Sequence, residues 1–165
     1  MQWSSQGASV NVVCCSKPKK DPERAERFLQ ACGVLGAHGV VLDAIDRGAH
    51  EPLALPSWGA EMFRDFDWVL THNSLGEYGH PHHKQVHEFV YERAVDSPLM
   101  YFGREAPQPM KYQLTDAQIE RKLAALKCYD HTSCTDKKPK WEALVDRYFG
   151  GNVQRLGEES YVYCR

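Results

Sequence analysis

The chain has 165 residues, of which 42% are hydrophobic and 25% are charged, and its formal net charge is −2. This size and balance predict one soluble globular domain over residues 1–165, and the small net charge gives no reason to expect a nucleic-acid partner. No apolar run reaches the roughly 20 residues of a membrane span, and the six cysteines include no CxxC pair, which favours reduced thiols in a cytoplasmic protein.

Strand-like and helix-like patterns alternate along the chain. In order, they predict a strand at 10–15, a helix at 23–35, a strand at 39–43, a short helix capped by Ser57 and ending at 63, a strand at 67–72, a helix at 81–94, a strand at 99–103, helices at 116–128 and 139–149, and a last strand at 161–163. The alternation favours an α/β fold with an open, mostly parallel, Rossmann-like sheet and flanking helices. Ligands in such folds collect at the carboxyl ends of strands, which points to the segment after residues 67–72.

That segment is rich in histidine. Residues 71–87 hold five of the eight histidines of the chain. At 100° per residue, His80, His83 and His87 fall within about 60° of one another on a helix, whereas His82 points away from them. Neutral imidazole is the commonest metal ligand and the usual proton carrier near neutral pH. The spacing therefore predicts a metal or acid–base site at the start of the helix.

The order Tyr78-Gly-His80-Pro-x-His83, after a strand that ends in Thr-His, resembles the second motif of the PIG-L/LmbE-like zinc-dependent N-deacetylases. Residues 7–13, 24–35 and 127–133 resemble the second strand, the following helix and a late histidine-containing segment of that family. The resemblance implies an LmbE-like fold and hydrolysis of an N-acetyl amide on a sugar or glycoconjugate. It also implies a zinc cofactor, although another divalent metal would fit the same ligands.

The resemblance also assigns roles to residues. His83 matches a zinc ligand, His80 matches an electrostatic stabiliser or general acid, and Tyr78 matches a tyrosine that stabilises the tetrahedral oxyanion. In the implied mechanism, zinc activates a water and polarises the amide carbonyl while a carboxylate takes the water's proton. Candidate substrate-pocket residues are His72, Asn73 and His131, and His72 and His131 are equally well explained as a strand end and an exposed loop residue.

Two departures from the family pattern stand out. The His-Pro-Asp-Asp-Glu signature, which supplies two zinc ligands and the general base, is absent from the sequence, so the chain is expected to lack the first strand and part of the first helix. His82 also stands where the family usually has an acid. A partner segment could supply the missing groups, or they could come from this chain, with His87, Glu77 and Asp46 as candidate ligands or bases. Ordinary surface positions explain His87 and Asp46 as well.

Other functions fit the same residues. An inactive relative that retains a carbohydrate-binding cleft is the main alternative, because two ligands and the base are missing. A metal-buffering or redox protein that uses histidine and cysteine is a further one. The expected absence of the first strand leaves an open sheet edge beside residues 10–15, which predicts self-association or pairing with a partner segment.

Overall fold

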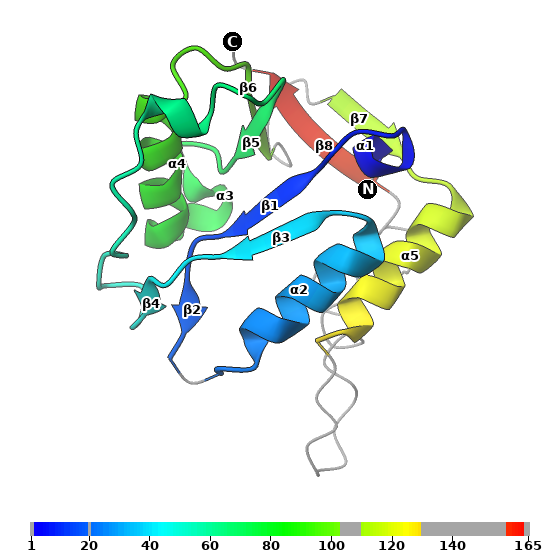
Figure 1. Cartoon of the computed structure of the whole chain (residues 1–165), viewed down its shortest axis with the longest axis horizontal. Helices are drawn as coiled ribbons and strands as arrows, with labels where there is room; N and C mark the ends of the chain where they lie inside the picture. Colours follow the sequence, from blue (N-terminus) through cyan, green and yellow to red (C-terminus); the bar gives the residue numbers. More distant parts are fainter. Residues whose placement is uncertain (1, 20, 103–109, 130–157, 164–165) are drawn as a thin grey trace. The chain divides into compact units, whose positions relative to one another are not determined.

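The computed structural model describes residues 2–19, 21–102, 110–129 and 158–163 (Figure 1). Within these ranges the protein is mixed α/β, with five α-helices and short strands. The chain divides into two compact units, Met1–Asp43 with Tyr112–Glu159 and Ala44–Lys111 with Ser160–Arg165. The single domain over 1–165 stays a prediction, and the helix expected at 139–149 lies outside the described residues. None of the helices in the described ranges has the length and apolar character needed to cross a bilayer.

The first unit contains a β–α–β arrangement. β1 (Asn11–Cys14) and β3 (His38–Val41) pair in parallel, and α2 (Arg24–Leu35) connects them. Gly36 ends α2 with a φ of 69°, in the left-handed region where glycine carries no steric penalty. Gly39 allows the helix to approach β3, since an added Cβ would lie 3.0 Å from the Cys32 sulfur. The predicted strands and helix are confirmed here. The unit also contains α1 (Gln2–Ser5) and β2 (Lys17–Pro18).

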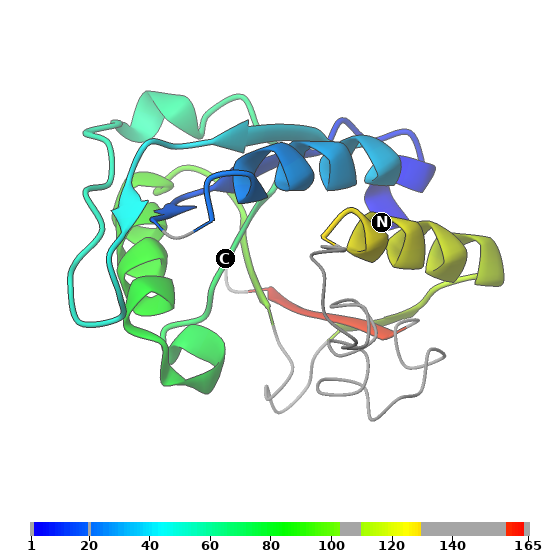
Figure 2. The ribbon, with the colours of Figure 1, turned by 90° about the horizontal axis from the view of Figure 1, so that it is seen from below.

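α5 (Asp116–Lys127) packs against α2, as Figure 2 shows. Thr115 caps its first turn as predicted. The Thr115 hydroxyl accepts from the Gln118 amide, and the Gln118 side chain accepts from the Thr115 amide at 2.9 Å. This reciprocal capping box satisfies two donors that the helix itself leaves unpaired. Ile119 and Ala125 on α5 are buried, as are Ala31 and Cys32 on α2.

Replacing Thr115 by alanine removes one half of the capping box. We expect the free energy of unfolding to fall by about 1 kcal/mol, because an N-cap side chain typically contributes that amount. Urea unfolding followed by circular dichroism measures the change. Thr115→Ser keeps the hydroxyl and should stay close to wild type, so an equal loss in both variants would contradict a capping role.

The thiol of Cys15 lies next to β1 and is half-buried. Burial, aided by the neighbouring Cys14, raises the pKa of Cys15 from 9.0 to about 11. As the pH rises, the Cys15 thiol therefore ionises in the unfolded chain before it ionises in the folded chain. The stability that this thiol contributes is present below pH 9 and is lost as the pH rises through about 11.

We expect iodoacetamide at pH 8 to alkylate Cys15 about 100-fold more slowly in the native chain than in the urea-unfolded chain, because only the thiolate reacts. Mass spectrometry of the peptide that contains Cys15 measures both rates. Equal rates in the native and unfolded chains would contradict the raised pKa.

The second unit has a second β–α–β arrangement, which carries the histidine-rich segment. β5 (Val69–Thr71) and β6 (Leu99–Phe102) pair in parallel, and α4 (Pro81–Arg93) lies between them in the chain. Pro81 occupies the first turn of α4, where its missing N–H costs nothing. β8 (Glu158–Tyr163) pairs with β6 in the antiparallel direction, so this sheet is mixed. In the chain, β7 (Met110–Gln113) lies between β6 and α5.

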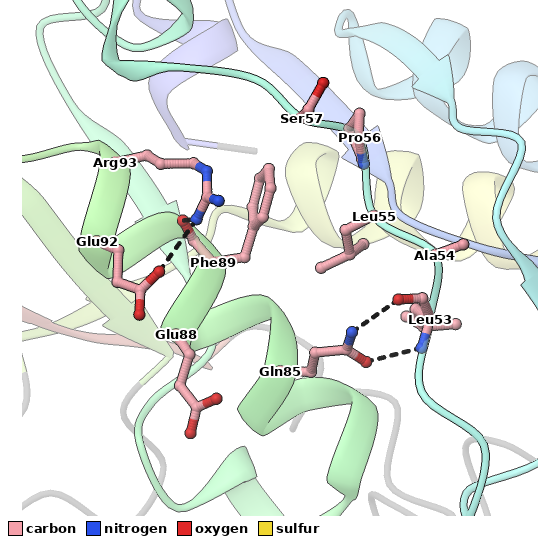
Figure 3. Close-up of a pocket in the computed structure, with 10 residues that line it drawn as sticks. All are labelled: Leu53, Ala54, Leu55, Pro56, Ser57, Gln85, Glu88, Phe89, Glu92 and Arg93. Atoms are coloured by element: carbon pink, nitrogen blue, oxygen red, sulfur yellow. Dashed lines mark hydrogen bonds and ion pairs between the residues drawn. The ribbon is translucent and has the colours of Figure 1, made fainter.

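The connection from Ala44 to β5 differs from the prediction in one respect. It contains β4 (Ile45–Asp46) and a 3₁₀ turn, η1 (Ala60–Met62), which starts after Gly59 without a side-chain cap. The prediction that Ser57 caps a helix is wrong, because the turn begins only after Gly59, whose backbone is extended. Residues 53–57 instead run beside α4. Figure 3 shows that the Gln85 amide pairs with both backbone groups of Leu53, at 2.8 and 2.7 Å. A cavity of about 490 Å³ lies between this segment and α4.

Candidate metal centre

The histidine-rich segment connects β5 to α4. His72 follows the last residue of β5, and His83 lies in the first turn of α4. Between them lies a kinked turn, α3 (Gly76–Gly79), in which Glu77 and Tyr78 have non-helical backbone angles, and His80 is the N-cap residue of α4. The end of a strand and the start of a helix thus bring the imidazoles of His72 and His83 together.

Glu77 joins the two imidazoles. One of its oxygens, Oε2, lies 2.9 Å from His72 Nδ1 and 2.6 Å from His83 Nδ1. The two rings stack with their centroids 4.0 Å apart and an angle of 12° between their planes. Ligand atoms of His72, Glu77 and His83 all lie within 4.8 Å of one another. We call these three residues the metal-site cluster.

Hydrogen-bonding rules determine where the imidazole hydrogens lie. An ionised carboxylate only accepts, so His72 and His83 both donate to Glu77 through Nδ1, and an ion held by all three side chains would take the place of these two hydrogens. Two imidazoles and one carboxylate form a donor set that catalytic zinc sites use. The three side chains are 23–27% exposed, so an ion can reach them from solvent.

The backbone of Glu77 is strained. Its φ of 56° and ψ of −76° make it the one non-glycine residue with positive φ in the part of the chain that the structure describes. Asn73 holds this conformation. Its side-chain oxygen, Oδ1, accepts from the backbone amides of Leu75 and Glu77, and its backbone amide donates to Glu77 Oε1 at 3.2 Å. Strain of this kind costs about 1–3 kcal/mol and is concentrated at functional sites. Asn73, expected as a pocket residue, therefore also fixes the carboxylate of the cluster.

Tyr78 and His80 flank the cluster. The Tyr78 ring is 73% exposed and meets the His83 ring edge-on, with the centroids 5.3 Å apart. The His80 ring lies 4.8 Å from the His83 ring. Burial, followed by the charges of His83 and His82, lowers the pKa of His80. Its Nδ1 is buried without a hydrogen-bond partner, and because an unpaired acceptor is better tolerated than an unpaired donor, the neutral ring carries its hydrogen on Nε2.

The remaining candidate residues lie outside the metal-site cluster. His82 is buried, and its Nε2 donates to the Glu51 carbonyl at 2.8 Å, so it supports the fold of the connection. Asp46 lies near His82, with 3.9 Å between Oδ1 and Nδ1. His87 donates from Nδ1 to the backbone carbonyl of His72 at 2.9 Å. His131 lies outside the described residues.

The sequence pointed to Glu77 only as the acid nearest the motif, and its contact with both histidines was not predicted. The available signal was its position five residues after His72 and directly after Gly76, which has a φ of 68°.

The environment of His72 has opposing effects on the pKa of its imidazole. Burial and the positive charge of His83 lower it more than Glu77 raises it, and the result is a lowered pKa. A neutral imidazole is the form that binds metal ions.

Comparison of the chain with known protein families, curated proteins and solved structures found no match. The functional assignment therefore depends on the metal-site cluster and on the residues beside it.

Proposed function

We propose that the chain is a zinc-dependent N-deacetylase of the PIG-L/LmbE-like type, which hydrolyses an N-acetyl amide on a sugar or glycoconjugate. The observation that carries this proposal is the metal-site cluster, with Tyr78 and His80 beside it. Each β–α–β arrangement has the parallel strand pair of a Rossmann-like unit, which supports the finer proposal of a Rossmann-like fold, although the two pairs belong to separate sheets. The free thiols of the described cysteines agree with a cytoplasmic location.

The donor set fits a catalytic metal, because such sites use three protein ligands and leave one position open. When bound, zinc supplies a water of lowered pKa, near about 7, and polarises the amide carbonyl. The protein's own groups then act on the substrate. The Tyr78 hydroxyl would donate a hydrogen bond to the oxygen that gains negative charge, and the Nε2–H of His80 would donate a hydrogen bond to the leaving nitrogen, which takes its new proton from the attacking water.

A second candidate function is supported by the hydrogen bonds of Glu77. This carboxylate already accepts from His72, His83 and the Asn73 amide, so it is not free to act as a general base. It is also the one acidic member of the metal-site cluster among the described residues. This observation favours a protein that binds an N-acetylated sugar without hydrolysing it.

Acetate release from N-acetylglucosamine conjugates at saturating zinc separates the two candidates. The deacetylase proposal predicts turnover that chelation abolishes and that His83→Ala lowers by at least about 100-fold, the upper end of the loss from a weakened metal site. His50→Ala replaces an exposed histidine outside the cluster and serves as the matched control. Sugar binding without turnover would establish the second candidate, and neither binding nor turnover would overturn both.

A further inference from the structure

His87 lies one helical turn after His83 on α4 and contacts the backbone of His72, a member of the metal-site cluster. Its Nδ1 lies 2.9 Å from the backbone oxygen of His72. A carbonyl oxygen only accepts, so His87 must carry a hydrogen on Nδ1.

The ring of His87 is held from two sides. Tyr91, one turn further along α4, stacks on it with the centroids 5.7 Å apart and the planes 21° from parallel. Tyr101 on β6 meets it edge-on at 5.0 Å. Tyr101 is also the register partner of Thr71, the residue immediately before His72. His87 is therefore fixed where α4, β5 and β6 meet, and its direction toward the His72 carbonyl is fixed with it.

This arrangement gives α4 two contacts with the cluster. The helix supplies the side chain of His83 directly and, four residues later, holds the main chain of His72 through His87. One helical turn, about 5.4 Å along the axis, thus connects the two histidines whose rings stack at 4.0 Å. Side chains that orient metal ligands in this way typically change metal affinity by 10- to 100-fold when they are removed.

We propose that His87 is a positioning residue that fixes the separation of the two imidazoles and thereby sets the metal affinity of the cluster. The inference depends on the proposed function only in that the cluster binds a metal. It assigns His87 neither to the ligand set nor to the proton transfers. Its Nδ1–H, and not its ring as such, is the group that matters.

Three forms of the full chain test the proposal: wild type, His87→Leu and His87→Asn. Leucine fills much of the ring's space without a donor, whereas asparagine carries an N–H group at the position of Nδ1. Zinc affinity is measured by competition with a chelating dye, and thermal unfolding of the metal-free variants is recorded beside it. We expect His87→Leu to weaken zinc binding by about 10- to 100-fold and His87→Asn to remain within about threefold of wild type.

Each other outcome has a definite meaning. Equal weakening in both variants would overturn the proposal and indicate a direct ligand or a packing role, and unchanged affinity in His87→Leu would overturn it as well. If wild type binds no zinc, the proposed function fails, and nitrogen-15 NMR of the metal-free chain decides the positioning role separately. That role then requires His72 ring signals that shift in His87→Leu and return in His87→Asn, and their absence would overturn it.

Discussion

Replacing His83 by alanine is expected to abolish stoichiometric zinc binding. His83 contributes one of two imidazoles in the metal-site cluster, and its Nδ1 lies 2.6 Å from Glu77 Oε2. Loss of an outer-shell partner costs 10- to 100-fold in metal affinity, so the loss of a ligand should exceed about 100-fold. Isothermal titration calorimetry with zinc measures the change. The side chain is 26% exposed, so circular dichroism should show a folded variant.

Two controls make this result specific. His50→Ala removes an exposed histidine outside the cluster and should bind zinc as wild type does. His82→Ala removes a buried histidine that holds the Glu51 carbonyl, and it should lower stability while a folded fraction still binds zinc. Unchanged zinc affinity in His83→Ala would contradict the assignment of the cluster.

Replacing Leu99 by alanine is expected to have the largest effect on stability. Leu99 is 0% exposed and is the largest fully buried side chain among the described residues. It lies on β6, paired in register with Val69, the first residue of the strand that leads to His72. Leucine-to-alanine changes at such sites destabilise proteins by about 2–5 kcal/mol, because they leave a cavity as well as losing buried area.

The matched control for Leu99 is Leu75→Ala, which deletes the same atoms from a side chain that is 68% exposed. Urea unfolding of both variants should separate them, with a change of at most about 0.5 kcal/mol for the exposed position. Equal losses at the two positions would contradict the burial of Leu99.

The helices could be predicted because their signals are local. Gly36 ends α2, Pro81 starts α4, and Thr115 with Gln118 caps α5, and each signal acts within one turn of the chain. The short apolar strands were also recognisable. The parallel direction of the β1–β3 and β5–β6 pairs agrees with the prediction, but the antiparallel pairing of β8 with β6 was not predicted, because it joins segments that are far apart in the sequence. The prediction of a cap at Ser57 was wrong because the turn begins only after Gly59.

The site could be predicted only in part. The spacing of His80 and His83 pointed to this segment, and the structure places His83 in the metal-site cluster and His80 beside it. The carboxylate that joins His72 to His83 could not be predicted, since its position depends on the positive φ of Glu77 and on the side chain of Asn73. Helical periodicity also put His87 on the face of His83 but could not distinguish a ligand from a residue that holds the His72 carbonyl.

X-ray absorption spectroscopy of the zinc-loaded chain tests the central claim most directly, because it reports the atoms around the metal. The metal-site cluster predicts two imidazole nitrogens at about 2.0–2.1 Å together with oxygen ligands at similar distances. Sulfur at about 2.3 Å would instead place zinc on the cysteines. That result, or a shell of oxygen alone, would contradict a metal site at His72, Glu77 and His83.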